Sequence, residues 1–197
     1  MKHHVTLTLT ASLHATVREH LFPGDGCEAA AILICSRTPG QRQRLLAKDA
    51  LLVPYEACSM RAPDAITWPG QLIEDALDAA EQDDLSLILV HSHPGGMLEF
   101  SEIDDASDAA VMPCLFAAHG DIHGSAVMVQ DGRMQGRLYN ASMQATAIKL
   151  ISIIGDRLRF YFNSSPAVAP PMACSTAMTN ELGELSACII GVSGTGS

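Results

Sequence analysis

A short, mostly apolar segment that ends in two histidines constrains the fold more than any other feature of this chain. Residues 85–90, Leu-Ser-Leu-Ile-Leu-Val, are followed at once by His91-Ser92-His93-Pro94. An apolar run of this length is typical of a strand in the core rather than of a helix. The segment is therefore predicted to be a core strand that presents polar side chains at its end.

The rest of the chain up to residue 162 indicates further strands and helices. The predicted strands are 5–10, 27–36, 42–54 and the arms 125–129 and 134–139 of a hairpin around Asp131-Gly132. The predicted helices are Ser12–Phe22, Trp68–Gln82 and Ser101 to about Phe116. The three alanines in 27–36 also permit a helix, and residues 146–162 form one further pair of strands or helices with a turn at Gly155-Asp156. Together they predict a mixed α/β fold (α+β) with a largely antiparallel sheet.

Composition limits the domain organisation and the class of partner. With 197 residues, of which 48% are hydrophobic, the chain can bury one good core. We expect one domain over residues 1–163, a linker rich in Ser, Pro and Ala at 164–176, and a separate tail at 177–197. The net charge of -10 argues against nucleic acid, because a polyanion needs a basic surface.

No signal peptide is indicated, and no run of about 18 apolar residues suggests a membrane span. The six cysteines lack C-x-x-C spacing, which favours buried thiols in a reducing cytoplasm over a disulfide framework or a thiolate zinc site. We therefore expect a cytoplasmic protein without a membrane partner. Any metal must be held by histidines and carboxylates.

Five residues could together form a catalytic metal site. His91 and His93 are two apart at a strand end, so both imidazoles can face one ion. Ser101 and Asp104 are three apart at a helix start and share a face. Two imidazoles and one carboxylate leave a fourth zinc position open for water. Glu28 is then the candidate for the general base, and Ser101 is the candidate for a hydrogen-bond donor to the water or oxyanion.

Each of these residues also has a simpler interpretation. An isolated His-x-His is more often incidental than metal-binding, and Ser101-x-x-Asp104 is also a capping box at a helix N-terminus. Glu28 could lie at an exposed strand end. The other histidines, His3, His4, His14, His20, His119 and His123, are predicted to be surface or core residues.

The combined spacing resembles the JAMM (MPN/JAB) zinc metallopeptidase motif, H-[ST]-H-P-x(6)-S-x(2)-D, without departure. The resemblance covers roughly residues 5–160, and Glu28 in Cys27-Glu28-Ala29-Ala30-Ala31 is similar to the family's Glu-bearing segment, a less specific match. It implies a curved mixed sheet flanked by helices, similar to cytidine deaminases. It also implies Zn²⁺ bound by His91, His93 and Asp104, with Glu28 as the base and Ser101 as the donor.

The same resemblance implies a substrate class. Catalytic members of the family release ubiquitin or ubiquitin-like proteins, so the chain is expected to be a deubiquitinase-like isopeptidase acting on a bacterial ubiquitin-like protein. Two alternatives stay open from the sequence: release of sulfur or an amino acid from a sulfur-carrier protein, and a non-catalytic MPN scaffold.

Residues 186–197 indicate a strand that enters a glycine-rich turn, and Ser193 replaces the middle glycine of G-x-G-x-x-G. Residues 177–197 resemble the start of a ThiF/MoeB-type ubiquitin-activating adenylyltransferase domain, with a flexible Gly/Ser tail as the alternative. The resemblance to the ThiF/MoeB type implies a ThiF-like activating enzyme as a partner, either fused to this chain or encoded beside it. It also implies a ubiquitin-like conjugation system, for which antiphage defence is a hypothesis.

Overall fold

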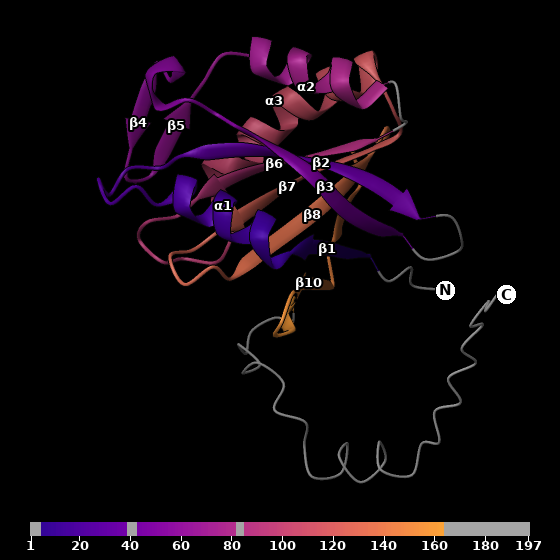
Figure 1. The fold of residues 1–197 in the computed structure, drawn as a ribbon. Helices are drawn as coiled ribbons and strands as arrows, with labels where there is room; N and C mark the ends of the chain where they lie inside the picture. The colour runs from indigo at the N-terminus through magenta and orange to yellow at the C-terminus, as the bar shows by residue number, and fades with distance from the viewer. Residues whose placement is uncertain (1–4, 39–42, 82–84, 164–197) are drawn as a thin grey trace, which may run out of the picture.

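The computed structural model describes residues 5–38, 43–81 and 85–163. Within these ranges a curled nine-stranded sheet has the order β11-β10-β1-β3-β2-β6-β7-β8-β9. Three neighbouring pairs, β10/β1, β1/β3 and β6/β7, are parallel and the others are antiparallel. The predicted mixed, mostly antiparallel α/β fold is therefore confirmed (Figure 1). The linker 164–176 and the tail 177–197 lie outside the described residues.

The nine strands of the sheet have the following bounds: β1 Thr6–Thr10, β2 Ala30–Thr38, β3 Arg44–Leu52, β6 Ser86–Ser92, β7 Ile122–Met128, β8 Met134–Asn140, β9 Ala145–Ala147, β10 Leu150–Ile154 and β11 Arg159–Phe162. A separate two-stranded sheet pairs β4 (Met60–Ala62) with β5 (Ala65–Thr67). The helices are α1 (Ala11–Leu21), α2 (Gln71–Glu81) and α3 (Glu102–Ala118), and a 3₁₀ turn covers Tyr55–Ala57.

The sheet is covered on both faces, and Figure 1 shows α1 on one side with α2 and α3 on the other. Alternate residues of β2 accordingly enter two different cores. Ala31 and Leu33 pack in the core beneath α1, whereas Ile32 packs with buried residues of α2 and α3. Period-two side-chain alternation explains this division, because both faces of a central strand are apolar.

Three predictions about local structure were resolved by the fold. The alanine-rich segment after Glu28 is the strand β2, so the helical alternative is wrong. Residues 146–162 are strands rather than helices, and the turn at Gly155-Asp156 lies between β10 and β11. The helix predicted from Trp68 begins only at Gln71. Pro69 and Gly70 precede it, and neither favours the interior of a helix.

The link from β6 through α3 to β7 determines where a site can form. β6 and β7 are parallel neighbours, so α3 must cross over between them. The chain leaves β6 at Ser92 and enters α3 at Glu102, and in the folded chain the start of α3 lies against the end of β6. No helix in the described part of the chain is long and apolar enough to cross a membrane.

Candidate metal centre

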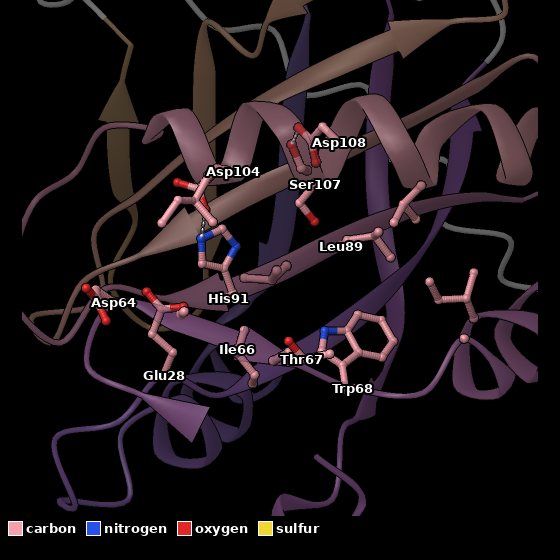
Figure 2. A pocket seen from close by; sticks show the side chains of 18 residues that line it. Glu28, Asp64, Ile66, Thr67, Trp68, Leu89, His91, Asp104, Ser107 and Asp108 are labelled. Atoms are coloured by element: carbon pink, nitrogen blue, oxygen red, sulfur yellow. Dashed lines mark hydrogen bonds and ion pairs between the residues drawn. The ribbon is translucent and has the colours of Figure 1, made fainter. Parts of the chain in front are cut away.

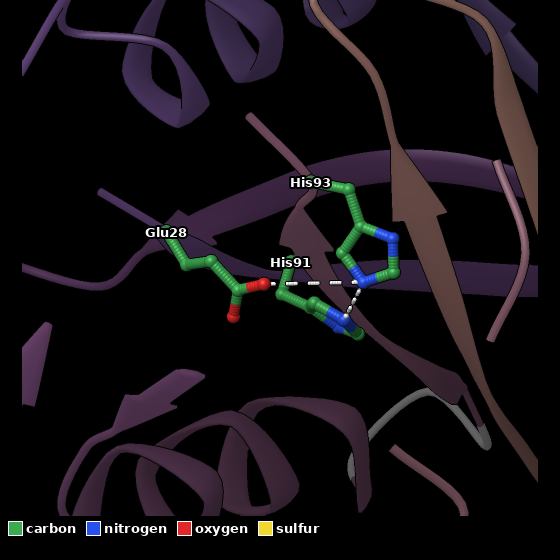
Figure 3. Close-up of side chains that lie close together, drawn as sticks. All are labelled: Glu28, His91 and His93. Atoms are coloured by element: carbon green, nitrogen blue, oxygen red, sulfur yellow. Dashed lines mark hydrogen bonds and ion pairs between the residues drawn. The ribbon is translucent and has the colours of Figure 1, made fainter. Parts of the chain in front are cut away.

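The end of β6 holds two histidines on the same side of the strand. Ser92, between them, is fully buried, and its hydroxyl accepts a hydrogen bond from the Ala29 amide at 2.9 Å. The Ser92 amide donates to the Ala29 carbonyl at 3.0 Å. With Ser92 turned inward, His91 and His93 turn the other way, and their Nε2 atoms lie 3.0 Å apart. The structure thus brings the two imidazoles together, as their two-residue spacing predicts (Figure 3).

Asp104, in the first turn of α3, contacts both histidines. Its Oδ1 lies 2.9 Å from His91 Nε2 and its Oδ2 lies 3.4 Å from His93 Nε2. Burial raises the pKa of the Asp104 carboxyl, but hydrogen bonds from the two histidines and from Ser101 outweigh it, so the net shift is downward. Asp104 is therefore an anion placed against two imidazole nitrogens.

Ser101 is the N-cap of α3, and the predicted capping box is present. The Ser101 hydroxyl accepts a hydrogen bond from the Asp104 amide, and the Asp104 carboxylate accepts one from the Ser101 amide at 2.6 Å. The same hydroxyl lies 2.8 Å from Asp104 Oδ2, to which it can donate. The structure thus places Ser101 against the Asp104 carboxylate. Its predicted role as a donor to water or an oxyanion stays a prediction.

Glu28 lies just before β2 and is buried, with only 4% of its surface exposed. Its amide donates to the Ala62 carbonyl at 2.8 Å, and its carbonyl accepts from Arg61 Nε at 2.8 Å. Its carboxylate points toward the histidines, with Oε1 3.9 Å from His93 Nε2 (Figure 3). Burial raises the pKa of Glu28 to about 7, although the nearby histidines act to lower it. The interpretation of Glu28 as an exposed strand end is therefore wrong.

Glu28, His91 and His93 form a group that could hold a metal ion. Each offers a ligand atom, and these atoms all lie within 4.8 Å of one another. Asp104 is not in this group, although it contacts both histidines, and Figure 2 shows it and Glu28 on different sides of His91. The site thus has a carboxylate on each side of an imidazole pair.

The donor set fits the zinc ion that the motif implies. Zn–N distances of about 2.0–2.1 Å in tetrahedral geometry place two nitrogen ligands roughly 3.3 Å apart, close to the observed 3.0 Å between the Nε2 atoms. His93 Nδ1 donates to the Met97 carbonyl at 2.8 Å, which leaves Nε2 available as a ligand. Burial lowers the pKa of His93, but its bonds to Asp104 and Met97 outweigh this and the net shift is upward.

A cavity of about 340 Å³ leads away from this site. Its polar end includes Glu28, His91 and Asp104, and farther along Trp68 and Leu89 contribute apolar surface (Figure 2). All three residues of β5 line the cavity, and α3 contributes a second wall. The sequence predicts no strand between residues 54 and 68, so β4 and β5 were missed. Strands of three residues show too little alternation to be detected from sequence.

The remaining described histidines lie apart from the cluster, as predicted. His14 is buried and bonds to the Gly132 carbonyl at 2.7 Å, and His20 stacks on Tyr55 with ring centroids 4.8 Å apart. His123 accepts from the Leu87 amide and donates to the His119 carbonyl, so both of its ring nitrogens serve the core.

Comparisons with known proteins identify the family of the chain and support its fold. A family model for prokaryotic homologs of the JAB domain matches residues 10–144. Comparison with curated proteins gives no match. Among solved structures, the solution structure of protein DSY2949 from Desulfitobacterium hafniense is similar with a TM-score of 0.51, at 14% sequence identity. The match covers 76% of this chain and 94% of that one, and at this identity it supports the fold alone. Because the family model spans more than half of the chain, this protein belongs to the prokaryotic JAB-domain family.

Proposed function

We propose that this chain is a zinc-dependent peptidase or isopeptidase that hydrolyses the bond after the C-terminus of a bacterial ubiquitin-like protein. The observation that carries the proposal is the approach of the His91 and His93 Nε2 atoms to 3.0 Å, with Asp104 on one side and buried Glu28 on the other. His91, His93 and Asp104 would be the metal ligands. Such a set leaves a coordination position open, as catalytic zinc sites do.

Bound zinc would supply Lewis acidity, which makes water a competent nucleophile at neutral pH and polarises the scissile carbonyl. In the proposed reaction the Glu28 carboxylate takes a proton from the attacking water and delivers it to the leaving amine. Burial raises the pKa of Glu28 above its usual value in the metal-free chain, which makes its carboxylate a better proton acceptor than an exposed one. Ser101 contributes by holding the Asp104 carboxylate in place.

The cavity supports a peptide substrate. β5 belongs to a two-stranded sheet within the described residues, and each of its residues lines the cavity that begins at Glu28 and His91. An extended peptide could pair its backbone with such an edge strand and present its terminal carbonyl at the polar end. The C-terminal tail of a ubiquitin-like protein has this extended form. The ThiF-like partner implied by residues 177–197 stays a prediction, because those residues lie outside the described part of the chain.

The first test is the zinc content of the purified full chain, measured by elemental analysis. We expect about one zinc per chain in the wild type, and its loss in Asp104→Ala and in a His91→Ala/His93→Ala double variant. The matched control is Asp78→Ala, which removes an exposed carboxylate from α2 and should retain the zinc. A wild-type chain that binds no zinc after reconstitution would leave the non-catalytic scaffold as the better hypothesis.

The second test uses mass spectrometry with a Gly-Gly-ended ubiquitin-like carrier joined to a lysine, and with the same carrier as a thiocarboxylate. Cleavage of the lysine conjugate is the expected result. Glu28→Gln should keep its zinc and lose about 10²–10⁴-fold in rate, because it removes the general base. Glu102→Gln, an exposed residue in the same first turn as Asp104, is the control. Turnover of the thiocarboxylate alone would favour the sulfur-carrier alternative.

A further inference from the structure

A buried polar cluster ties α3 to the two strands behind it. Asp108 of α3 is 7% exposed, and its Oδ2 accepts hydrogen bonds from Arg137 Nε at 2.9 Å and from the Tyr139 hydroxyl at 3.0 Å. The Ser125 hydroxyl donates to the same oxygen. Ser125 lies on β7, whereas Arg137 and Tyr139 lie on β8. One carboxylate oxygen therefore joins α3 to two strands.

Arg137 contacts the start of α3 at three places. Its guanidinium lies over the Phe100 ring, 3.8 Å from the centroid, and its Nη1 pairs with Asp105. Its Nη2 lies 2.6 Å from Asp108 Oδ2, in addition to the bond from Nε. Phe100 precedes Asp104 in the chain, whereas Asp105 and Asp108 follow it. The planar fork of arginine makes several such contacts at once, which a lysine cannot do.

Two separate conditions place Asp104 against the histidines. The Ser101 capping box orients the carboxylate relative to α3, but it lies within the helix N-terminus and cannot orient α3 relative to the sheet. His91, which lies 2.9 Å from Asp104, belongs to the sheet strand β6. Arg137 belongs to β8 of the same sheet, so its contacts with Phe100, Asp105 and Asp108 fix the helix start relative to the sheet.

We propose that Arg137 is a positioning residue for the metal site, which acts by holding the start of α3 so that Asp104 reaches His91 and His93. This inference rests on the proposed function, in which Asp104 is a metal ligand. Residues that orient ligands from outside the coordination shell typically change metal affinity by about 10–100-fold when they are replaced. Replacement of Arg137 should therefore weaken metal binding even in a chain that remains folded.

The test is a titration of the metal-free full chain with cobalt(II), followed by the visible absorption of the bound ion. The variants are Arg137→Gln, Arg137→Lys and Tyr139→Phe, and thermal unfolding in EDTA measures the stability of each. Tyr139→Phe removes a different hydrogen bond from the same Asp108 oxygen and leaves Arg137 in place. Arg133→Gln is the charge control, because Arg133 precedes β8 and pairs with Asp131 instead.

We expect Arg137→Lys to weaken cobalt binding about tenfold and to alter the absorption spectrum, while Arg133→Gln binds as the wild type does. Tyr139→Phe, which leaves the Arg137 contacts in place, should weaken binding less than Arg137→Lys does. Arg137→Gln should show a larger effect, and Arg137→Lys decides the matter where the glutamine variant does not fold. Wild-type affinity and spectrum in Arg137→Lys would overturn the inference. The inference would also be overturned if the loss of cobalt affinity were proportional to the loss of thermal stability in every variant, including Tyr139→Phe. Absence of cobalt binding in the wild type would instead refute the metal site itself.

Discussion

Arg61 donates a hydrogen bond from Nε to the backbone carbonyl of Glu28 across 2.8 Å. The guanidinium also pairs with Asp25 at 2.8 Å and lies over the Tyr55 ring, 4.4 Å from its centroid. The Glu28 amide is held by Ala62, the neighbour of Arg61 on β4. Both backbone groups of the proposed base are therefore fixed by the hairpin whose other strand lines the cavity.

Replacement of Arg61 should impair Glu28 without removing the metal. Arg61→Gln loses the bond to the Glu28 carbonyl and the pair with Asp25, so we expect a loss of about 2 kcal/mol in unfolding free energy. Hydrolysis of the Gly-Gly conjugate should fall about tenfold while zinc content stays constant. Arg44→Gln, at an exposed position on β3, is the matched control. Equal activity in Arg61→Gln and Arg44→Gln would contradict this prediction.

Ser92 should matter for stability although it lies between two proposed ligands. In Ser92→Ala the buried Ala29 amide loses its acceptor, which costs about 1–3 kcal/mol. Urea unfolding of the metal-free chain measures this cost without any contribution from zinc. Ser142→Ala, in an exposed turn, should change stability by less than about 0.5 kcal/mol. A Ser92→Ala variant as stable as Ser142→Ala would show that the Ala29 amide finds another partner.

The pH dependence of stability should reveal the buried Glu28 in the metal-free chain. Burial raises its pKa from 4.5 to about 7 in the folded state. Folding therefore favours the neutral form of the Glu28 carboxyl. The stability that neutral Glu28 contributes is fully present below pH 4.5 and is lost as the pH rises through 7. Glu28→Gln, which stays neutral, should match the wild type at pH 4 and exceed it at pH 8, by on the order of 1–3 kcal/mol.

Denaturant unfolding of both chains in EDTA at the two pH values measures this difference. Glu102→Gln is the control, because it removes an exposed carboxylate and should show no such dependence. A Glu28→Gln variant that is less stable than the wild type at pH 8 would mean that the ionised carboxylate is stabilised by its neighbours in the folded state.

Gly124 on β7 should not tolerate a side chain. A Cβ added there would lie 2.3 Å from the Arg137 carbonyl oxygen and 2.8 Å from Leu138 Cδ2, so β8 would have to move. We expect Gly124→Ala to lower the unfolding free energy by about 3 kcal/mol, measured by thermal or urea unfolding. Gly70→Ala meets no atom within 4 Å and is the control. A stable Gly124→Ala chain would show that β7 and β8 can separate locally.

The sequence predicted the local part of the site well, because local geometry follows from backbone periodicity. The two-residue spacing of His91 and His93 placed both imidazoles on one side of β6, and the three-residue spacing of Ser101 and Asp104 produced the capping box. Neither prediction needed knowledge of any distant residue. The family motif is built from these same local spacings, which is why it could be recognised in a single chain.

The sequence did not predict the contacts between segments far apart in the chain. The short hairpin of β4 and β5, the Arg61 bond to Glu28, and the Arg137 contacts with Asp105 and Asp108 were all missed. Arg137 and Asp108 are 29 residues apart, and no pattern of spacing marks two such residues as partners. Their approach depends on the pairing of β7 with β8 and on the crossover of α3.

The sequence by itself determined which residues could be ligands and on which side of their own strand or helix they lie, because side-chain direction repeats every two residues in a strand and every three to four in a helix. Only the tertiary structure decided that Glu28 is buried beside His93 and that the start of α3 meets the end of β6. Burial and proximity between remote segments depend on how the whole sheet closes. The raised pKa of Glu28 follows from that burial and not from its place in the sequence.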